Sequence, residues 1–418
     1  MLTLHFSNRL ETLTGRLFEQ LDRRQPDVFA RDEIIVPSMA LRRHLSIRRA
    51  ATAGISANLQ FDFLARWLWR QIARVVPDVA EESPFSAFRL AWQVLAAFEQ
   101  EELLANHPRL SIYLKGADAV MRYELALRLG TLFEAYVTYR PDWLQAWEHD
   151  QEPEDLASPA DRADAAWQAD LWRRIRLRQG ASGRDPVATF RLALEKPIQP
   201  GLLSAQVHVF ALPAMAPLHL GLLRALGKHM DIHLYVLNPC SEYWGDIVSR
   251  RELQRLRAQG RDELHEEGHR LLAGWGRQTR SYFRELMDCL DSDAVDDQEY
   301  TANSDTTLLA HVQNSLLDLT ELGPGSVTLT AQDRSIEVHV GHSLMRQLEI
   351  LQDHLLGLFA SADNGSLKPG DIVVAVPDLD AAAPLIEAVF SSASPARHIP
   401  YTITGRTPSV VEPVTRAF

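Results

Sequence analysis

The segment from His265 to His269 reads HEEGH and fits the HExxH pattern of zinc peptidases. On a helix, histidines four residues apart share a face and can bind zinc, while the glutamate acts as a general base. The flanking residues are acidic rather than apolar, and Gly268 lowers helix stability by about 1 kcal/mol relative to alanine. No histidine follows at the spacing of the extended motif, so a third ligand would have to be guessed, and Glu285 is the least unsuitable candidate. We therefore interpret the segment as a charged, solvated face, and a metallopeptidase remains the alternative.

Nucleotide chemistry requires a different pattern. ATP-driven motor domains carry GxxxxGK and then Ser or Thr between the first strand and helix, where backbone amides cradle phosphates. The turn at Ser7 to Leu10 has no glycine and no lysine. The nearest imitation, Gly221 to His229, is one residue too long and lies at a helix end. We expect Gly227 to cap that helix in the left-handed region, and we expect no nucleotide cofactor.

The remaining candidate acids have simple explanations. Asp378 and Asp380 follow an expected strand and could imitate a metal-binding pair, but capping of the next helix is the better interpretation. Asp246 is interpreted as a turn residue. The sequence therefore indicates no catalytic residue, no metal ligand and no cofactor.

Basic and aromatic residues alternate near the N-terminus, a pattern that can track a phosphate backbone and stack bases. The alternative is a solvated helix face with the tryptophans in the core. The residues are Arg42, Arg43, Arg48, Arg49, Arg66, Trp67, Trp69, Arg70 and Arg74.

Composition restricts the class of protein. The length of 418 residues suits two or three domains, and 46% hydrophobic residues can form a sizeable core. The formal net charge of -12 means that any DNA contact must use a local basic surface. Two cysteines are too few for a disulfide framework, and no apolar run approaches a membrane span, so a reducing cytoplasm is expected.

The elements that must position these residues alternate between α/β and helical stretches. Strands are expected at 2–6, 33–36, 207–212, 231–237, 335–340, 371–376 and 401–404. Helices are expected between the strands and throughout 56–195, with a further one near 277–290.

This order predicts an α/β domain interrupted by a helical insertion, followed by the start of a second α/β domain. The expected segments are 1–55 and 200–248 for the two halves of the first domain, 56–199 for the insertion, 249–332 for a polar, partly helical connection, and 333–418 for the second domain. Because the last residues read as a helix barely begun, we expect the chain to be a fragment or a shortened gene product.

Several aromatic-rich strings resemble RecC, the gamma subunit of the bacterial exonuclease V (RecBCD) complex. They occur in the family's order and lie at 57–61, 139–147, 166–172, 225–247, 271–276 and 399–403. The resemblance implies an inactivated superfamily 1 helicase fold, with a RecA-like domain 1A, a 1B-like insertion and the beginning of domain 2A. The missing phosphate loop agrees with it and disfavours the related AddB subunits, which keep that loop.

The resemblance also implies a role. RecC is a non-catalytic scaffold that holds the RecB helicase-nuclease and the RecD helicase, helps to split the duplex and scans the 3′-ended strand for Chi. The implied partners are RecB-like and RecD-like subunits and single-stranded and forked DNA, with no membrane. The alternatives are a purely structural scaffold without DNA contact and an autonomous ATP-driven helicase.

The family's strand-reading surface can be carried over residue by residue. Trp69, Leu132 and Arg140 match it, and we expect the fold to bring Trp69 and Arg140 to one channel wall. At other positions of that surface this chain departs from enterobacterial members, with Glu134 in place of an aspartate. The departing residues are Pro37, Met39, Arg43, Phe63, Thr131 and Glu134. We take Arg43, Phe63 and Glu134 as further DNA-contact candidates.

Overall fold

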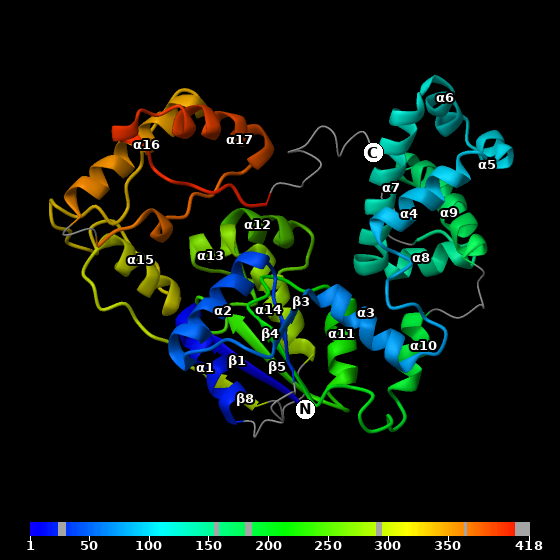
Figure 1. The fold of residues 1–418 in the computed structure, drawn as a ribbon, viewed down its shortest axis with the longest axis horizontal. Coiled ribbons are helices and arrows are strands. Elements are labelled where there is room, and N and C mark those ends of the chain that lie inside the picture. Colours follow the sequence, from blue (N-terminus) through cyan, green and yellow to red (C-terminus); the bar gives the residue numbers. More distant parts are fainter. Residues whose placement is uncertain (24–30, 154–158, 180–185, 290–294, 363–365, 406–418) are drawn as a thin grey trace. The chain divides into compact units, whose positions relative to one another are not determined.

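The computed structural model (Figure 1) describes residues 1–23, 31–153, 159–179, 186–289, 295–362 and 366–405. The chain divides into two compact units. The sheet unit comprises 1–306 and 310–328, and the C-terminal unit comprises 307–309 and 329–418. Among the described residues, no helix has the length and hydrophobicity that crossing a bilayer requires.

The sheet unit is built on a six-stranded parallel sheet, which confirms the expected α/β class. The strand order is β3-β2-β4-β5-β1-β8. The strands are β1 (Leu2–Ser7), β2 (Asp32–Ile35), β3 (Leu59–Asp62), β4 (Gln206–Phe210), β5 (Asp231–Leu237) and β8 (Val295–Gln298).

The expected strands at 2–6, 33–36, 207–212 and 231–237 correspond to β1, β2, β4 and β5, while β3 and β8 were not expected. β8 reads VDDQ, and aspartate is depleted in strands. Its backbone pairs with β1, with Thr3 opposite Val295, so tertiary pairing overrides the local preference.

Helices make up much of the rest of the sheet unit, and among its described residues α3–α10 follow one another between β3 and β4. The helices that precede residue 329 are α1 (Leu10–Arg23), α2 (Met39–Ala53), α3 (Leu64–Val75), α4 (Ala87–Ala97), α5 (Glu101–Asn106), α6 (Pro108–Gly116), α7 (Ala119–Tyr139), α8 (Pro141–Glu148), α9 (Pro159–Arg178), α10 (Pro186–Ala193), α11 (Pro217–Leu226), α12 (Arg250–Ala258), α13 (Arg270–Trp275), α14 (Arg277–Cys289) and α15 (Leu308–Leu317). A two-stranded sheet joins β6 (Ile247–Val248) to β7 (Glu266–Glu267).

The two faces of the large sheet bury different side chains because neighbouring strand residues point to opposite faces. Leu4 and Phe6 of β1 belong to the larger core cluster, which extends into the helical stretch and α11. Phe210 and Tyr235 belong to a second cluster with residues of α1 and α2. Both clusters consist of nearly inaccessible side chains, so the sheet is buried on both sides, as parallel sheets usually are.

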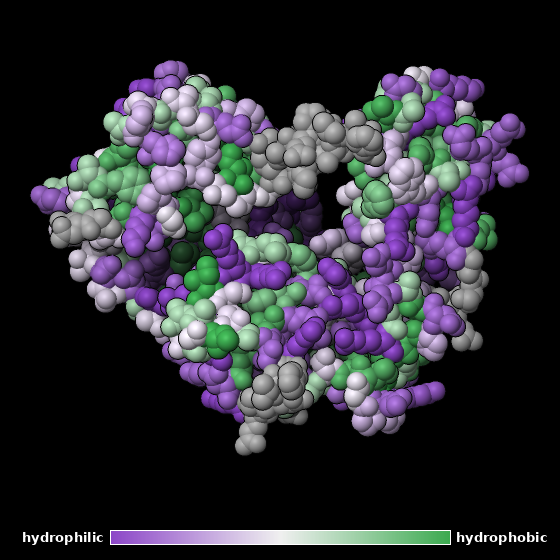
Figure 2. Space-filling model, viewed as in Figure 1, coloured by the Kyte–Doolittle hydropathy of each residue, from purple (hydrophilic) through white to green (hydrophobic). Residues whose placement is uncertain are grey.

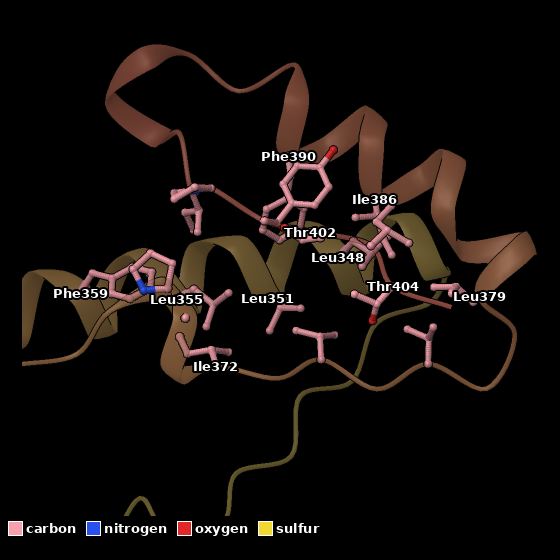
Figure 3. A pocket seen from close by; sticks show the side chains of 18 residues that line it. Leu348, Leu351, Leu355, Phe359, Ile372, Leu379, Ile386, Phe390, Thr402 and Thr404 are labelled. Carbon is pink, nitrogen blue, oxygen red and sulfur yellow. The ribbon is translucent and has the colours of Figure 1, made fainter. Parts of the chain in front are cut away.

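The C-terminal unit contains α16 (Leu344–Ser361), α17 (Leu379–Ile386), a π-helical turn at Glu387–Ser391 and short 3₁₀ turns at Pro369–Asp371 and Pro395–Arg397. Its apolar cluster is shown in Figure 3, where leucines of α16 face Ile372 on an extended segment. The cluster consists of Leu348, Leu355, Val389, Phe390 and Ile399.

The strands expected at 335–340, 371–376 and 401–404 are not formed in the described residues. Alternation of side chains is a local property, whereas a strand exists only when its backbone pairs with a neighbour. Val338, Val340 and Val373 are therefore left 84%, 88% and 91% exposed. Hydrophobic residues are accordingly visible at the surface around α16 and α17 in Figure 2.

Candidate nucleic-acid interface

The turn between β1 and α1, where a motor protein would hold phosphate, is bonded to another part of the chain. The Asn8 side chain donates to the carbonyl of Thr301 at 2.9 Å and accepts from its backbone N–H at 3.0 Å. Ser7 Oγ accepts from the Arg9 backbone N–H at 3.1 Å. The loop is therefore held by side-chain hydrogen bonds instead of presenting a row of free amides to a phosphate.

The crevice at the carboxyl ends of β1 and β5, the usual ligand position in open α/β sheets, is filled by packed side chains. Asn238 follows β5 and is 3% exposed. Its amide donates to the Tyr300 hydroxyl at 2.8 Å, and its carbonyl accepts from Trp244 Nε1 at 2.9 Å. Trp244 is itself 1% exposed, so this segment, which carries much of the family resemblance, serves the core.

The end of α11 at Gly227, within the segment that imitates a phosphate loop, differs from the expectation. Gly227 has φ −59° and ψ −15°, so it caps α11 in the right-handed region and not in the expected left-handed one. Its carbonyl accepts from the N-terminal amine of Met1 at 2.6 Å. A tertiary contact at the helix end thus replaces the local cap that the sequence suggested.

The HEEGH segment is not helical, so the zinc-peptidase alternative fails. Glu266 and Glu267 form β7, paired with β6, and His269 is the N-cap residue before α13. In an extended chain, histidines at i and i+4 are not neighbours on a helix face. The expected solvated face holds for Glu266 and Glu267, which are exposed, but His269 is 5% exposed and lies 3.2 Å from Ser315 Oγ through Nε2.

The capping interpretation of Asp378 is confirmed. Its carboxylate accepts from the backbone N–H of Ala381 at 3.0 Å at the start of α17. Asp380 lies in the first turn of the same helix, where a negative charge is favourable.

Three of the six DNA-contact candidates line one cavity of about 630 Å³ in the sheet unit. Trp69 lies on α3, Phe63 is the residue just before α3, and Glu134 lies on α7. The fold thus brings together residues about 70 positions apart in sequence, because α3 and α7 both border this cavity. Its other polar lining includes Arg66, Arg70, Glu81, Glu82, Ser83, Ser86, Thr138 and His219.

The two aromatic candidates differ in exposure. Trp69 is 8% exposed, donates Nε1–H to the Ala80 carbonyl at 2.9 Å and packs edge-on against Phe85, with ring centroids 6.1 Å apart. Phe63 is 44% exposed and precedes the first residue of α3. Trp69 therefore builds the wall, and Phe63 offers the larger apolar surface to a base.

The charges at the cavity come in both signs. Arg70 lies 2.5 Å from the Asp62 carboxylate, which is 6% exposed. Arg66 is 74% exposed and lies farther from the same carboxylate, at 3.9 Å. Burial lowers the pKa of His219 to about 4, so its imidazole is neutral near pH 7 and can donate one hydrogen bond and accept another. Such a lining suits polar base edges better than a row of phosphates.

The other three candidates lie away from the cavity lining. Leu132 on α7 is half-buried and packs against the larger core cluster. Arg140, between α7 and α8, bonds Asp142 at 3.2 and 2.9 Å and lies over the Trp143 ring at 4.0 Å. Arg43 is exposed on α2. A shared wall for Trp69 and Arg140 stays a prediction.

An exposed aromatic group on α4 and α7 was missed by the sequence analysis. Phe88 and Trp92 are 60% and 51% exposed, and the Trp92 ring lies 5.7 Å from that of Tyr123. Phe88 and Trp92 share helical spacing with Leu95 and Phe98 in the stretch that was expected to be helical. Helical spacing could not have marked this stripe as exposed, because residues four apart share a face whether that face is buried or exposed.

The chain is similar to known proteins over most of its length. A family model described as the N-terminal domain of RecC matches residues 2–319. The chain belongs to the RecC family. It is 31% identical to the RecBCD enzyme subunit RecC of Escherichia coli, with 100% of this chain and 40% of that protein covered. It is 30% identical to the RecC subunits of Haemophilus influenzae and Mycolicibacterium smegmatis, with 93% of this chain and 39% and 34% of those proteins covered. The chain thus spans about two fifths or less of these relatives, and it matches the N-terminal part of the family.

Proposed function

We propose that this chain is the N-terminal part of a non-catalytic subunit that guides a single DNA strand through a RecBCD-type helicase-nuclease and reads it for a Chi-like sequence. RecB-like and RecD-like subunits are the proposed partners, and forked and single-stranded DNA are the proposed substrates. The observation that carries the proposal is the cavity in which Phe63, Trp69 and Glu134 meet.

The cavity chemistry supports contact with an unpaired base. The Phe63 ring can stack on any base, and stacking contributes about 1–3 kcal/mol per base by alanine substitution. The Glu134 carboxylate is exposed and accepts hydrogen bonds such as that from the exocyclic amine of cytosine. The exposed Arg66 guanidinium can neutralise a backbone phosphate beside the stacked base.

The filled crevice of the sheet supports an inactivated, RecA-like motor as the origin of the sheet unit. Side chains of Asn8, Asn238 and Trp244 are bonded where an ATP-driven domain needs open backbone amides. A subunit of this kind depends on its partners for movement along DNA. A purely structural scaffold shares this feature, and only the cavity distinguishes the two functions.

The test uses the complete subunit purified together with its RecB-like and RecD-like partners. Phe63→Ala should weaken or redirect the cleavage pattern that depends on the recognised sequence, while the rate of duplex unwinding stays within about twofold of the parent. Phe88→Ala is the matched control, because this phenylalanine is also exposed but lies outside the cavity lining.

Sequence-dependent fragments that are unchanged in Phe63→Ala and in Glu134→Gln would exclude the cavity as a reading site. Equal loss in Phe88→Ala would point to a general effect of surface aromatics. A parallel loss of unwinding would place the cavity in subunit assembly instead.

A further inference from the structure

Three potential metal-binding side chains meet in the C-terminal unit, far in sequence from the HEEGH motif. Glu337 Oε2 lies 3.6 Å from His339 Nε2 and 3.5 Å from His354 Nε2. One ligand atom from each residue lies within 4.8 Å of the others. Within the described residues, this is the one group of three or more such side chains with that spacing.

These separations suit a tetrahedral ion. Zinc binds imidazole nitrogen and carboxylate oxygen at about 2.0–2.2 Å, which separates two ligands on a tetrahedron by about 3.4 Å. The two distances from Glu337 are already near that value, and the imidazole centroids are 4.9 Å apart with planes at 53°. The two histidine nitrogens lie within 4.8 Å of each other. Small rotations of the two imidazole rings would therefore bring these nitrogens to a similar separation.

The chain positions the ligands by local rules. Glu337 and His339 are two residues apart, and their side chains lie close together, with Glu337 Oε2 3.6 Å from His339 Nε2. His354 projects from α16, the helix whose Leu351 and Leu355 face the apolar cluster in Figure 3. The helix start is fixed because Ser343 Oγ accepts from the Arg346 backbone N–H at 3.2 Å.

Hydrogen bonds are formed on both sides of Glu337 and His339 in the sequence. Asp333 Oδ1 accepts from the Ser335 backbone N–H at 2.9 Å, and the Gly341 carbonyl accepts from Gln347 Nε2 at 3.3 Å. Arg334 approaches the other carboxylate oxygen of Glu337, Oε1, at 3.4 Å. This ion pair leaves Oε2 facing the two histidines and orients it, as supporting contacts do at protein metal sites.

We propose that Glu337, His339 and His354 form a binding site for a divalent first-row transition ion of the zinc type. Two imidazoles and one carboxylate leave one position of the tetrahedron for water, as in zinc sites with three protein ligands. The side chains are 27–48% exposed, so an ion can reach them from solvent. A bound ion would hold the 335–340 segment against α16. In the described residues this segment is not paired with another strand.

The test is titration of the full chain with Zn²⁺ by calorimetry, together with Co²⁺ as a probe whose visible spectrum reports tetrahedral coordination. We expect one equivalent to bind, with the Co²⁺ spectrum lost in His354→Ala and His339→Ala. Removing even an outer partner of a metal site costs about 10–100-fold in affinity, so loss of a direct ligand should weaken binding at least tenfold.

His342→Ala is the matched control, because this exposed histidine lies three residues from His339 but is not in the cluster. It should bind as the parent does. The proposal is wrong if no equivalent binds, or if the control loses as much affinity as His354→Ala. Circular dichroism of each variant reports whether it folds, and His339→Ala, outside any helix, keeps the test valid if a change on α16 disturbs the unit.

Discussion

Among single residues, Trp69 and Phe63 line one cavity, but their different exposure predicts different effects on stability. Trp69→Ala removes an 8%-exposed indole and its hydrogen bond to Ala80. We expect a loss of about 3–5 kcal/mol in the free energy of unfolding, measured by urea denaturation. Phe63→Ala should cost less than about 1 kcal/mol, because the ring is 44% exposed. Equal losses would show that Phe63 is a core residue and would weaken its proposed contact with a base.

His219 gives the stability a defined dependence on pH. Burial lowers its pKa from 6.5 to about 4, so between these values the unfolded chain holds a proton that the folded chain does not. The stabilising contribution is therefore complete above pH 6.5 and is lost as the pH falls towards 4. His219→Gln should make the fall in denaturation midpoint over this interval shallower.

Some slope should remain in that variant, because burial also lowers the pKa of His233 to about 4. An unchanged slope in His219→Gln would contradict the burial of this imidazole.

Among the elements, the close crossing of α4 and α7 depends on a glycine. A Cβ at Gly130 would lie 2.4 Å from the Ala87 carbonyl oxygen and 2.9 Å from the Ala91 backbone nitrogen. These are backbone atoms of a helix, which cannot rotate away as a side chain can. Gly130→Ala should therefore destabilise the chain by at least about 1–3 kcal/mol. Thermal unfolding followed by circular dichroism measures the change.

Gly357 is the matched control because it also lies inside a helix, α16, and a Cβ there would meet nothing within 4 Å. Gly357→Ala should be neutral or stabilising by up to about 1 kcal/mol. A neutral Gly130→Ala would show that α4 and α7 pack less tightly than the crossing indicates, and an equal loss in Gly357→Ala would show that the effect is not specific to this crossing.

For the molecule as a whole, the filled crevice of the sheet predicts that the chain does not bind ATP. Asn8 is bonded to Thr301, and the turn carries neither the glycines nor the lysine that phosphates need. Calorimetry with magnesium and ATP should show no binding to the isolated chain. Binding that disappears in Lys228→Ala would restore the imitation phosphate loop as a site and would overturn this expectation.

The sequence by itself determined the α/β class, the helical stretch between β3 and β4, and the family. Periods of two and of 3.6 residues are local, so apolar runs such as those of β4, β5 and α11 could be assigned directly. The missing lysine and glycine at Ser7 to Leu10 were also visible without a fold. So were the carboxylate that caps α17 and the rare strings that resemble RecC.

Tertiary structure alone decided the rest, because it depends on which distant segments meet. β8 is a strand only because β1 pairs with it, and the HEEGH segment is extended because β7 pairs with β6. Helical spacing could not tell the buried Trp69 from the exposed Trp92, since burial is set by what packs against each face. The cavity at Phe63 and the cluster at His354 likewise required the folded chain to bring their members together.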